Sequence, residues 1–292
     1  MKTNDKIRVA VFGYGNIGKA VEEAVSVTSD MTLAGIFHHD EMDRLEASRP
    51  DVVLLGVPSR EAPATAERLL EKGFNTVDSF DIHTQIPAVY RRLDDAARAH
   101  NAVSILSAGW DPGSDSVVRA LMEALVPQGL TYTDFGPGRS MGHTVAAKHI
   151  PGVRDALSMT IPLGTGIHRR MVYVEIEKGH TYDEVRDAIL RDDYFAHDET
   201  HVIEVDSVKA LNNVAHGVRL SRNGVSGTTH NQRIDFNMTI NNPALTGQIM
   251  VATARAAMRL LERGQYGCYT MIQLAPVDML EGGSEEWIKR LV

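Results

Sequence analysis

Three glycines near the start of the chain constrain its fold more than any other feature. The apolar run Ile7–Gly13 leads into Gly13-Tyr14-Gly15-Asn16-Ile17-Gly18, and Asn16–Val27 then carries apolar residues at helical spacing. A glycine turn between a strand and a helix is typical of a dinucleotide-binding unit, because glycine permits a tight turn, close approach of a pyrophosphate and close helix packing. The helix N-terminus adds N–H donors for the phosphates. We therefore predict that all six residues of this turn contact a dinucleotide.

The alternation of strands and helices continues beyond this turn. Further strands are expected at Leu33–Phe37, Val52–Val57, Asn75–Val77 and Val103–Ser107, with helices such as Glu61–Lys72 and Ile86–His100 between them. Only Asp40–Asp51 joins the second strand to the third, so that crossover helix should be short. The pattern predicts an α/β fold with a Rossmann-like, doubly wound parallel sheet.

The character of the sequence changes after Gly109. Glycine- and proline-rich turns separate expected strands at Ala156–Ile161, Arg170–Glu177 and Arg233–Ile240, which favours a second, mixed α+β domain. A long helix over Pro243–Arg263, a strand over Cys268–Leu274 and a tail helix anchored in the core by Trp287 are expected to follow. We predict a dinucleotide-binding domain over residues 1–111, with 243–292 packing back onto it, and a second domain over 112–242.

Composition excludes several classes of protein. A formal charge of −8 with dispersed basic residues argues against a nucleic-acid partner, and no apolar run is long enough to span a membrane. The polar N-terminus does not resemble a secretory signal, so a cytoplasmic location is expected. The single cysteine, Cys268, cannot form an internal disulfide, and the histidines lack the spacing of a metal site, so we predict no bound metal.

Two aspartates follow neighbouring strands of the predicted sheet. Ser79-Phe80-Asp81 comes after the fourth strand, and Trp110-Asp111-Pro112-Gly113 comes after the fifth. Ligands of open α/β sheets bind at the carboxyl ends of the strands, so the two carboxylates should share one cleft. Such a pair can hold a substrate ammonium and accept a proton from it. We predict that Asp81 and Asp111 are catalytic.

Other polar residues suggest how the cofactor and a substrate carboxylate are bound. His38-His39-Asp40 ends the second strand, where an acid binds a ribose 2′-hydroxyl and a base a 2′-phosphate, so these residues leave the cofactor type open. In the second domain, Arg170 can bind a carboxylate through two parallel hydrogen bonds, with Thr160 and Asn242 adding neutral ones.

Several longer stretches of the chain match a known family. They are RVAVFGYGNIG (8–18), TVDSFDIH (76–83), SAGWDPGSDS (107–116), FGPGRSMGH (135–143), IPGVRDALSMTIP (150–162), GVSGTTHNQ (224–232), NNPALT (241–246) and GCYTMI (267–272). Through these stretches the chain resembles the meso-diaminopimelate dehydrogenases over essentially its full length, and is most similar to their shorter branch of broader specificity.

The resemblance implies a reaction and a set of binding residues. The expected activity is reversible, NADP-dependent oxidative deamination of meso-2,6-diaminopimelate to L-2-amino-6-oxopimelate, in lysine and cell-wall precursor synthesis, by a homodimer whose second domain binds substrate and dimerises. Asp81 and Asp111 would hold the amine of the D-centre. The residues expected to shape that pocket are Trp110, Phe135, Met141 and Gly142, and those expected at the distal L-centre are Thr160, Arg170, His216 and Asn242. Further cofactor contacts are expected at His38, His39, Ser59, Arg60, Ser79, Phe80, Pro112 and Gly113.

Two departures from the family pattern keep alternatives open. The family usually has basic residues where this chain has His38-His39-Asp40, so NAD is an alternative to NADP unless Arg44 or Arg60 binds the 2′-phosphate. Phe135 replaces a tryptophan of the longer branch, which suggests a roomier pocket that accepts simple D-amino acids. A dehydrogenase for such substrates is one alternative function, and a dinucleotide sensor without catalysis is another.

Overall fold

The chain forms two compact units in the computed structural model, which describes residues 6–211 and 216–292. The first unit contains the residues up to Ala120 together with Asn242–Val292, and the second contains Leu121–Asn241. The sequence predicts a domain boundary after residue 111. The two units divide a little later, after Ala120, within helix α5 (Ser114–Leu125), which runs unbroken from one unit into the other.

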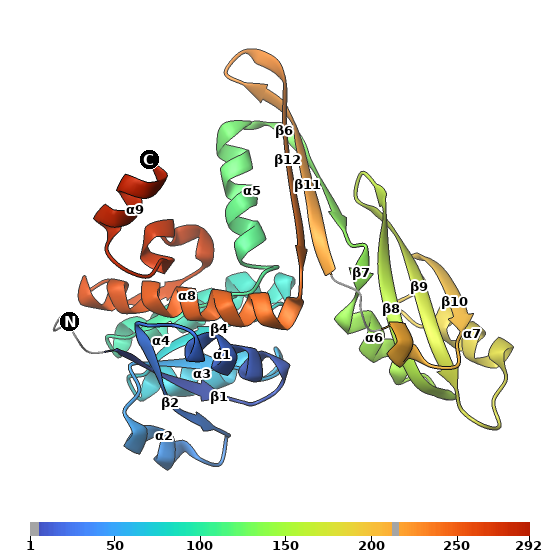
Figure 1. Cartoon of the computed structure of the whole chain (residues 1–292), viewed down its shortest axis with the longest axis horizontal. Coiled ribbons are helices and arrows are strands. Elements are labelled where there is room, and N and C mark those ends of the chain that lie inside the picture. Colours follow the sequence, from blue (N-terminus) through green and yellow to red (C-terminus); the bar gives the residue numbers. More distant parts are fainter. Residues whose placement is uncertain (1–5, 212–215) are drawn as a thin grey trace. The chain divides into compact units, whose positions relative to one another are not determined.

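A six-stranded parallel sheet forms the centre of the first unit (Figure 1). Its order is β2-β1-β3-β4-β5-β13, with bounds Met31–Phe37, Ile7–Phe12, Val52–Leu55, Asn75–Asp78, Val103–Ile105 and Gly267–Tyr269. The chain leaves β1 toward β2 and then returns to the other side of β1 at β3. Open sheets of this kind bind ligands at such a reversal of strand order. The predicted doubly wound fold is confirmed.

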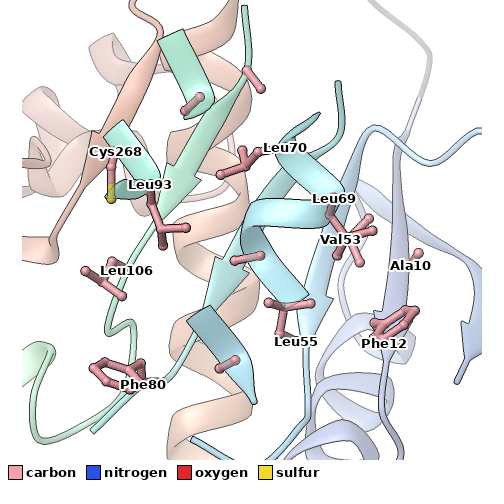
Figure 2. Packing of buried hydrophobic residues seen from close by; sticks show 14 of the residues in the cluster. Ala10, Phe12, Val53, Leu55, Leu69, Leu70, Phe80, Leu93, Leu106 and Cys268 are labelled. Carbon is pink, nitrogen blue, oxygen red and sulfur yellow. The ribbon is translucent and has the colours of Figure 1, made fainter. Parts of the chain in front are cut away.

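Helices cover both faces of this sheet, which explains why its strands are continuous apolar runs. The helices α2 (Met42–Ser48), α3 (Ala62–Glu71) and α4 (Ile86–Ala99) pack on one face, where Leu69, Leu70 and Leu93 belong to one buried cluster with Val53 and Leu55 (Figure 2). The helices α1 (Asn16–Ser26) and α8 (Asn242–Glu262) cover the other. The crossover helix α2 is short, as the spacing of the strands predicts.

The C-terminal segment completes the first unit. Helix α8 approaches α1 so closely that a Cβ atom at Gly247 would lie 2.6 Å from the carbonyl carbon of Ala20. Arg255 of α8 also donates to Asp30 at 2.6 Å, which ties the helix to the segment before β2. The strand β13 then pairs with β5 and ends at Tyr269, because Thr270 caps a 3-10 turn over Met271–Gln273. The predicted strand over Cys268–Leu274 is thus shorter than expected.

The prediction that Trp287 anchors the tail in the core is wrong. Helix α9 (Ser284–Leu291) contains no buried residue, and Trp287 is only half-buried. Its indole N–H donates to the carbonyl of Glu281 at 2.6 Å, and the guanidinium of Arg290 lies 4.9 Å from its ring centroid. Four of the eight residues of this helix are charged, so it has too few apolar side chains to form a buried face.

Two separate sheets form the second unit. One has the order β10-β9-β8-β7 and the other is antiparallel with the order β12-β11-β6. Their bounds, in these orders, are Glu199–Glu204, Ile167–Ile176, Val153–Gly164 and Gly138–Arg139, then Thr229–Ile240, His216–Ser226 and Gln128–Phe135.

Two helices complete this mixed α+β unit, as the sequence predicts. Helix α6 (Met141–Lys148) and helix α7 (Tyr182–Arg191) contribute to the core of the four-stranded sheet, where Ile189 packs among buried valines. Among the described residues of both units, no helix combines the length and the apolar character that a membrane span requires.

Candidate active site

A cradle of three glycines follows β1 at the carboxyl edge of the sheet. Gly13 has a φ of +91°, which other residues rarely adopt, and its carbonyl oxygen lies between Gly18 and Gly56. A Cβ atom at Gly56 would lie 2.6 Å from that oxygen, and one at Gly18 would collide with it. The close approach of β1, α1 and the loop after β3 therefore requires all three glycines. Gly56 was missed in the sequence, where it lies inside the predicted strand Val52–Val57; β3 ends one residue before it, at Leu55.

The N-terminus of α1 has the features of a pyrophosphate site. Gly15 is the N-cap and, without a side chain, accepts no hydrogen bond from the first turn, which contains Asn16, Ile17 and Gly18. A Cβ atom at Gly15 would meet nothing closer than 3.8 Å. Tyr14 is exposed, and its hydroxyl donates to Glu22. The open cradle and the N–H groups of the helix fit a dinucleotide pyrophosphate.

A cavity of about 350 Å³ opens beside this turn. Its polar lining consists of His38 and His39 after β2, Arg60 and Glu61 after β3, and Thr65 and Arg68 of α3. Within residues 6–211 and 216–292, neither arginine forms an ion pair, so both are available to a ligand anion. Arg68 was missed in the sequence analysis. It lies one helical turn after Ala64, which also lines the cavity.

Arg44 does not line this cavity and pairs instead with Glu41. The suggestion that Arg44 substitutes for the basic residues of the family is therefore not supported, and Arg60 remains with the newly found Arg68. No cluster of three or more metal-binding side chains occurs in the described part of the chain.

The two predicted catalytic aspartates lie in loops that leave adjacent strands of the sheet. Asp81 follows β4, after Ser79 and the buried Phe80, and accepts a hydrogen bond from Ser59 Oγ at 2.6 Å. Asp111 follows β5 and the buried Trp110, and Pro112 and Gly113, both buried, continue from it into α5. The described structure thus brings both aspartates to the carboxyl edge of one sheet.

The protonation of Asp111 depends on a second, buried carboxyl group. Burial, followed by the negative charge of Asp115, raises the pKa of Asp111 to about 6, against the opposing charges of His83 and Arg119. Asp115 is fully buried on the first turn of α5 and accepts a hydrogen bond from Arg119 Nε at 2.9 Å. His83 Nε2 lies 4.0 Å from Asp111 Oδ1. Asp115, Arg119 and His83 were missed because only the folded loop places them beside Asp111.

The second unit holds Arg170 in a defined orientation. Arg170 and Thr160 face each other on the paired strands β9 and β8, and the guanidinium donates to Thr160 Oγ1. Arg170 Nε also donates to Asp198 Oδ2 at 2.6 Å, and its side chain is only 15% exposed. The sequence analysis names Thr160 as a substrate residue, whereas it missed Asp198, which lies in the connection before β10.

Three histidines surround this guanidinium. Burial, followed by the charge of Arg170, lowers the pKa of His143, His168 and His216, so all three favour the neutral form. His168 Nε2 accepts a hydrogen bond from the backbone N–H of Phe135 at 2.8 Å. His143 lies on α6 and stacks edge-on against Tyr194, with ring centroids 5.5 Å apart. Of these histidines, the sequence prediction includes only His216.

The other predicted substrate residues are distributed over both units. Gly142 lies on the first turn of α6, where a Cβ atom would be 3.9 Å from the ring of Tyr194. Met141 begins the same helix, and its side chain lies outside the described structure. Asn242 belongs to the first unit, where it begins α8 and accepts a hydrogen bond from Thr246 at 3.1 Å. Each unit therefore presents its own group of candidate binding residues.

Comparisons with known proteins point to a single family. Residues 109–167 match the model of the diaminopimelic acid dehydrogenase C-terminal domain. A meso-diaminopimelate D-dehydrogenase of Bacteroides fragilis is 52% identical over 98% of this chain and 99% of its own length. The structure of a C. glutamicum DAP dehydrogenase in complex with DAP aligns with a TM-score of 0.88 at 29% identity, covering 99% of this chain and 100% of that one. An engineered D-amino acid dehydrogenase bound to NADP+ aligns with a TM-score of 0.83 at 28% identity, covering 98% and 100%.

Alanine substitution should separate the roles of two glycines in the cradle. Gly15→Ala should cost no more than about 1 kcal/mol of stability, because its Cβ atom meets open space, yet should weaken dinucleotide binding at least tenfold by occupying the place of the pyrophosphate. Gly18→Ala should lose binding and also about 1–3 kcal/mol of stability, since its Cβ atom collides with backbone. Thermal unfolding and fluorescence titration measure the two effects. Unchanged affinity in Gly15→Ala would contradict a pyrophosphate at this turn.

Proposed function

The chain belongs to the meso-diaminopimelate D-dehydrogenase family of oxidoreductases, and on this premise we propose that it oxidises the D-centre of meso-2,6-diaminopimelate. The proposed reaction is reversible and yields L-2-amino-6-oxopimelate and ammonia, with NADP as the hydride acceptor. The observation that carries this proposal is 52% identity over nearly the whole chain to a dehydrogenase named for this substrate. The homodimer implied by the family resemblance stays a prediction.

We propose that Asp81 and Asp111 hold the ammonium group of the D-centre. The amine must lose a proton before hydride can leave its carbon, and Asp111 can accept that proton once it is ionised. Because its pKa is raised to about 6, Asp111 is a carboxylate under alkaline conditions and a stronger base than an ordinary aspartate. When bound, the nicotinamide accepts the hydride. A water held by the same carboxylates can then attack the imine carbon.

We propose that the second unit recognises the L-centre of the substrate. Arg170 carries the charge that suits a carboxylate, and the hydrogen bonds to Thr160 and Asp198 fix its orientation. Burial, followed by the charge of Arg170, lowers the pKa of His216, so this side chain is mainly neutral near pH 7 and adds a polar group beside the guanidinium. Phe135, Met141 and Gly142 are proposed to line the pocket of the substrate chain.

The cavity beside the glycine turn supports NADP as the cofactor. Arg60 and Arg68 both line it, so two guanidinium groups can face the 2′-phosphate even though His38 and His39 replace the usual basic residues. Glu61 also lines the cavity and is the group best suited to the 2′-hydroxyl of NAD. We propose that the two arginines outweigh this single acid.

Removing the two arginines tests this assignment. The variant Arg60→Ala/Arg68→Ala should weaken NADP binding at least tenfold, because each charge-assisted hydrogen bond contributes about 1.5–3 kcal/mol, while NAD binding changes less than about threefold. The matched control is Arg44→Ala, since Arg44 lies outside the cavity and should affect neither cofactor. An equal loss of affinity for NADP and for NAD would show that the two arginines do not bind the 2′-phosphate.

The stereochemistry of the substrate tests the proposed reaction. NADP reduction followed at 340 nm at alkaline pH should occur with meso-diaminopimelate, which has a D-centre, and not with the LL isomer, which has none. Arg170→Met should then lose at least tenfold more activity with meso-diaminopimelate than with a simple D-amino acid, because only the two-headed substrate needs the guanidinium. Turnover of simple D-amino acids alone would favour the alternative of a D-amino acid dehydrogenase.

The carboxyl groups of Asp111 and Asp115 together predict how turnover depends on pH. In the wild type, turnover should fall as pH drops through about 6, because Asp111 then gains a proton and cannot accept another. Asp115→Asn removes a negative charge that raises this pKa, so the acid limb of the profile should move to lower pH. Asp43→Asn, on the first turn of α2, is the control and should leave the limb in place. An unmoved limb in Asp115→Asn would exclude Asp111 as the titrating base.

A further inference from the structure

A buried aspartate links the two loops that follow β4 and β5. Asp78 ends β4 and is 1% exposed, and its Oδ1 atom accepts hydrogen bonds from the N–H groups of Phe80 at 2.9 Å and Ser107 at 3.1 Å. Its backbone carbonyl also accepts a hydrogen bond from the N–H of Ala108 at 2.7 Å. A single residue thus binds its own loop once and the neighbouring loop twice.

The linked loops are the ones that carry Asp81 and Asp111. Asp81 comes directly after Phe80, whose N–H is held by Asp78, and Trp110 and Asp111 follow shortly after Ala108. Ser107 has a φ of +60°, a conformation that costs free energy for a serine and persists only where the surroundings fix it. The hydrogen bond to Asp78 is one such constraint, and it acts where the chain turns out of the sheet.

We propose that Asp78 is a positioning residue of the candidate active site, whose carboxyl group fixes the two aspartate loops relative to each other. This inference rests on the proposed function for the roles of Asp81 and Asp111. Displacement of catalytic groups by about 1 Å can reduce turnover by about two orders of magnitude, so a fixed distance between the loops has a direct kinetic value.

To hold the two loops, the side chain of Asp78 needs an oxygen that accepts hydrogen bonds, and it needs no negative charge. Burial raises the pKa of Asp78 to about 6, while the N–H groups of Phe80 and Ser107 oppose this shift. Oδ2 of Asp78 and Oγ of Ser107 are both buried without a hydrogen-bond partner in the described part of the chain, so nothing there stabilises a charge on Oδ2. Asparagine has the same shape and keeps the accepting oxygen, whereas leucine has the shape and accepts nothing.

The test compares Asp78→Asn with Asp78→Leu in the full-length enzyme. Asparagine should keep turnover within about threefold of wild type, and leucine should lower kcat by about a hundredfold, because only leucine removes the acceptor oxygen that holds the two loops. If Asp78→Leu does not fold, the smaller Asp78→Ala, which also accepts no hydrogen bond, carries the same expectation. Equal turnover of the folded leucine or alanine variant and wild type would overturn the proposal, as would equal losses in all variants.

A spectroscopic measurement separates this inference from the proposed reaction. The chain has two tryptophans, so a Trp287→Phe background leaves Trp110, in the loop after β5, as the only one. Its emission should shift to longer wavelength in the leucine variant and stay in place in the asparagine variant, because only leucine releases the loop. If diaminopimelate is not turned over, the proposed reaction fails while this shift still tests the link. Unchanged emission in the folded leucine variant would mean that Asp78 only stabilises the fold.

Discussion

The close contact between the glycine turn and the end of β3 is the constraint on which the first unit depends. The carbonyl oxygen of Gly13 occupies the space that side chains at Gly18 and Gly56 would fill. This contact brings the N-terminus of α1 to the carboxyl edge of the sheet, next to the cavity lined by Arg60 and Arg68. One packing requirement therefore fixes both the helix end that suits a pyrophosphate and the arginines that suit a phosphate beside it.

Local patterns in the sequence predicted the elements of the fold and the loops of the site. The glycine turn, the apolar strands and the short link to β3 are signals contained in a few neighbouring residues, and each was sufficient to predict its element. The partners of the site were harder to predict, because Asp115, Asp198 and Arg68 act through neighbours that only folding brings together. Trp287 shows the opposite error, since an aromatic residue on a short charged helix resembles a core anchor until its surroundings are known.

The candidate binding residues of the two units carry opposite charges: carboxyl groups in the first unit and a guanidinium group in the second. The first unit places Asp78, Asp111 and Asp115 in buried or half-buried positions around the ends of β4 and β5, and burial favours the protonated form of Asp78 and Asp111. The second unit surrounds Arg170 with histidines that burial and the charge of Arg170 keep neutral. In the proposed function, the carboxylates of the first unit bind the amine that reacts, and the guanidinium of the second unit binds the distant carboxylate.

The pairing of β13 with β5 has a consequence for how the protein is made. The strand that precedes the Asp111 loop has one edge covered by residues near the C-terminus, and α8 covers a face of the same sheet. The first unit is therefore discontinuous in the chain, and the second unit is inserted into it. Because domains fold as units during synthesis, the inserted unit can acquire its structure while the ribosome is still translating. The sheet that supports the candidate catalytic loops is complete only once α8 and β13, which follow the second unit in the chain, have been translated.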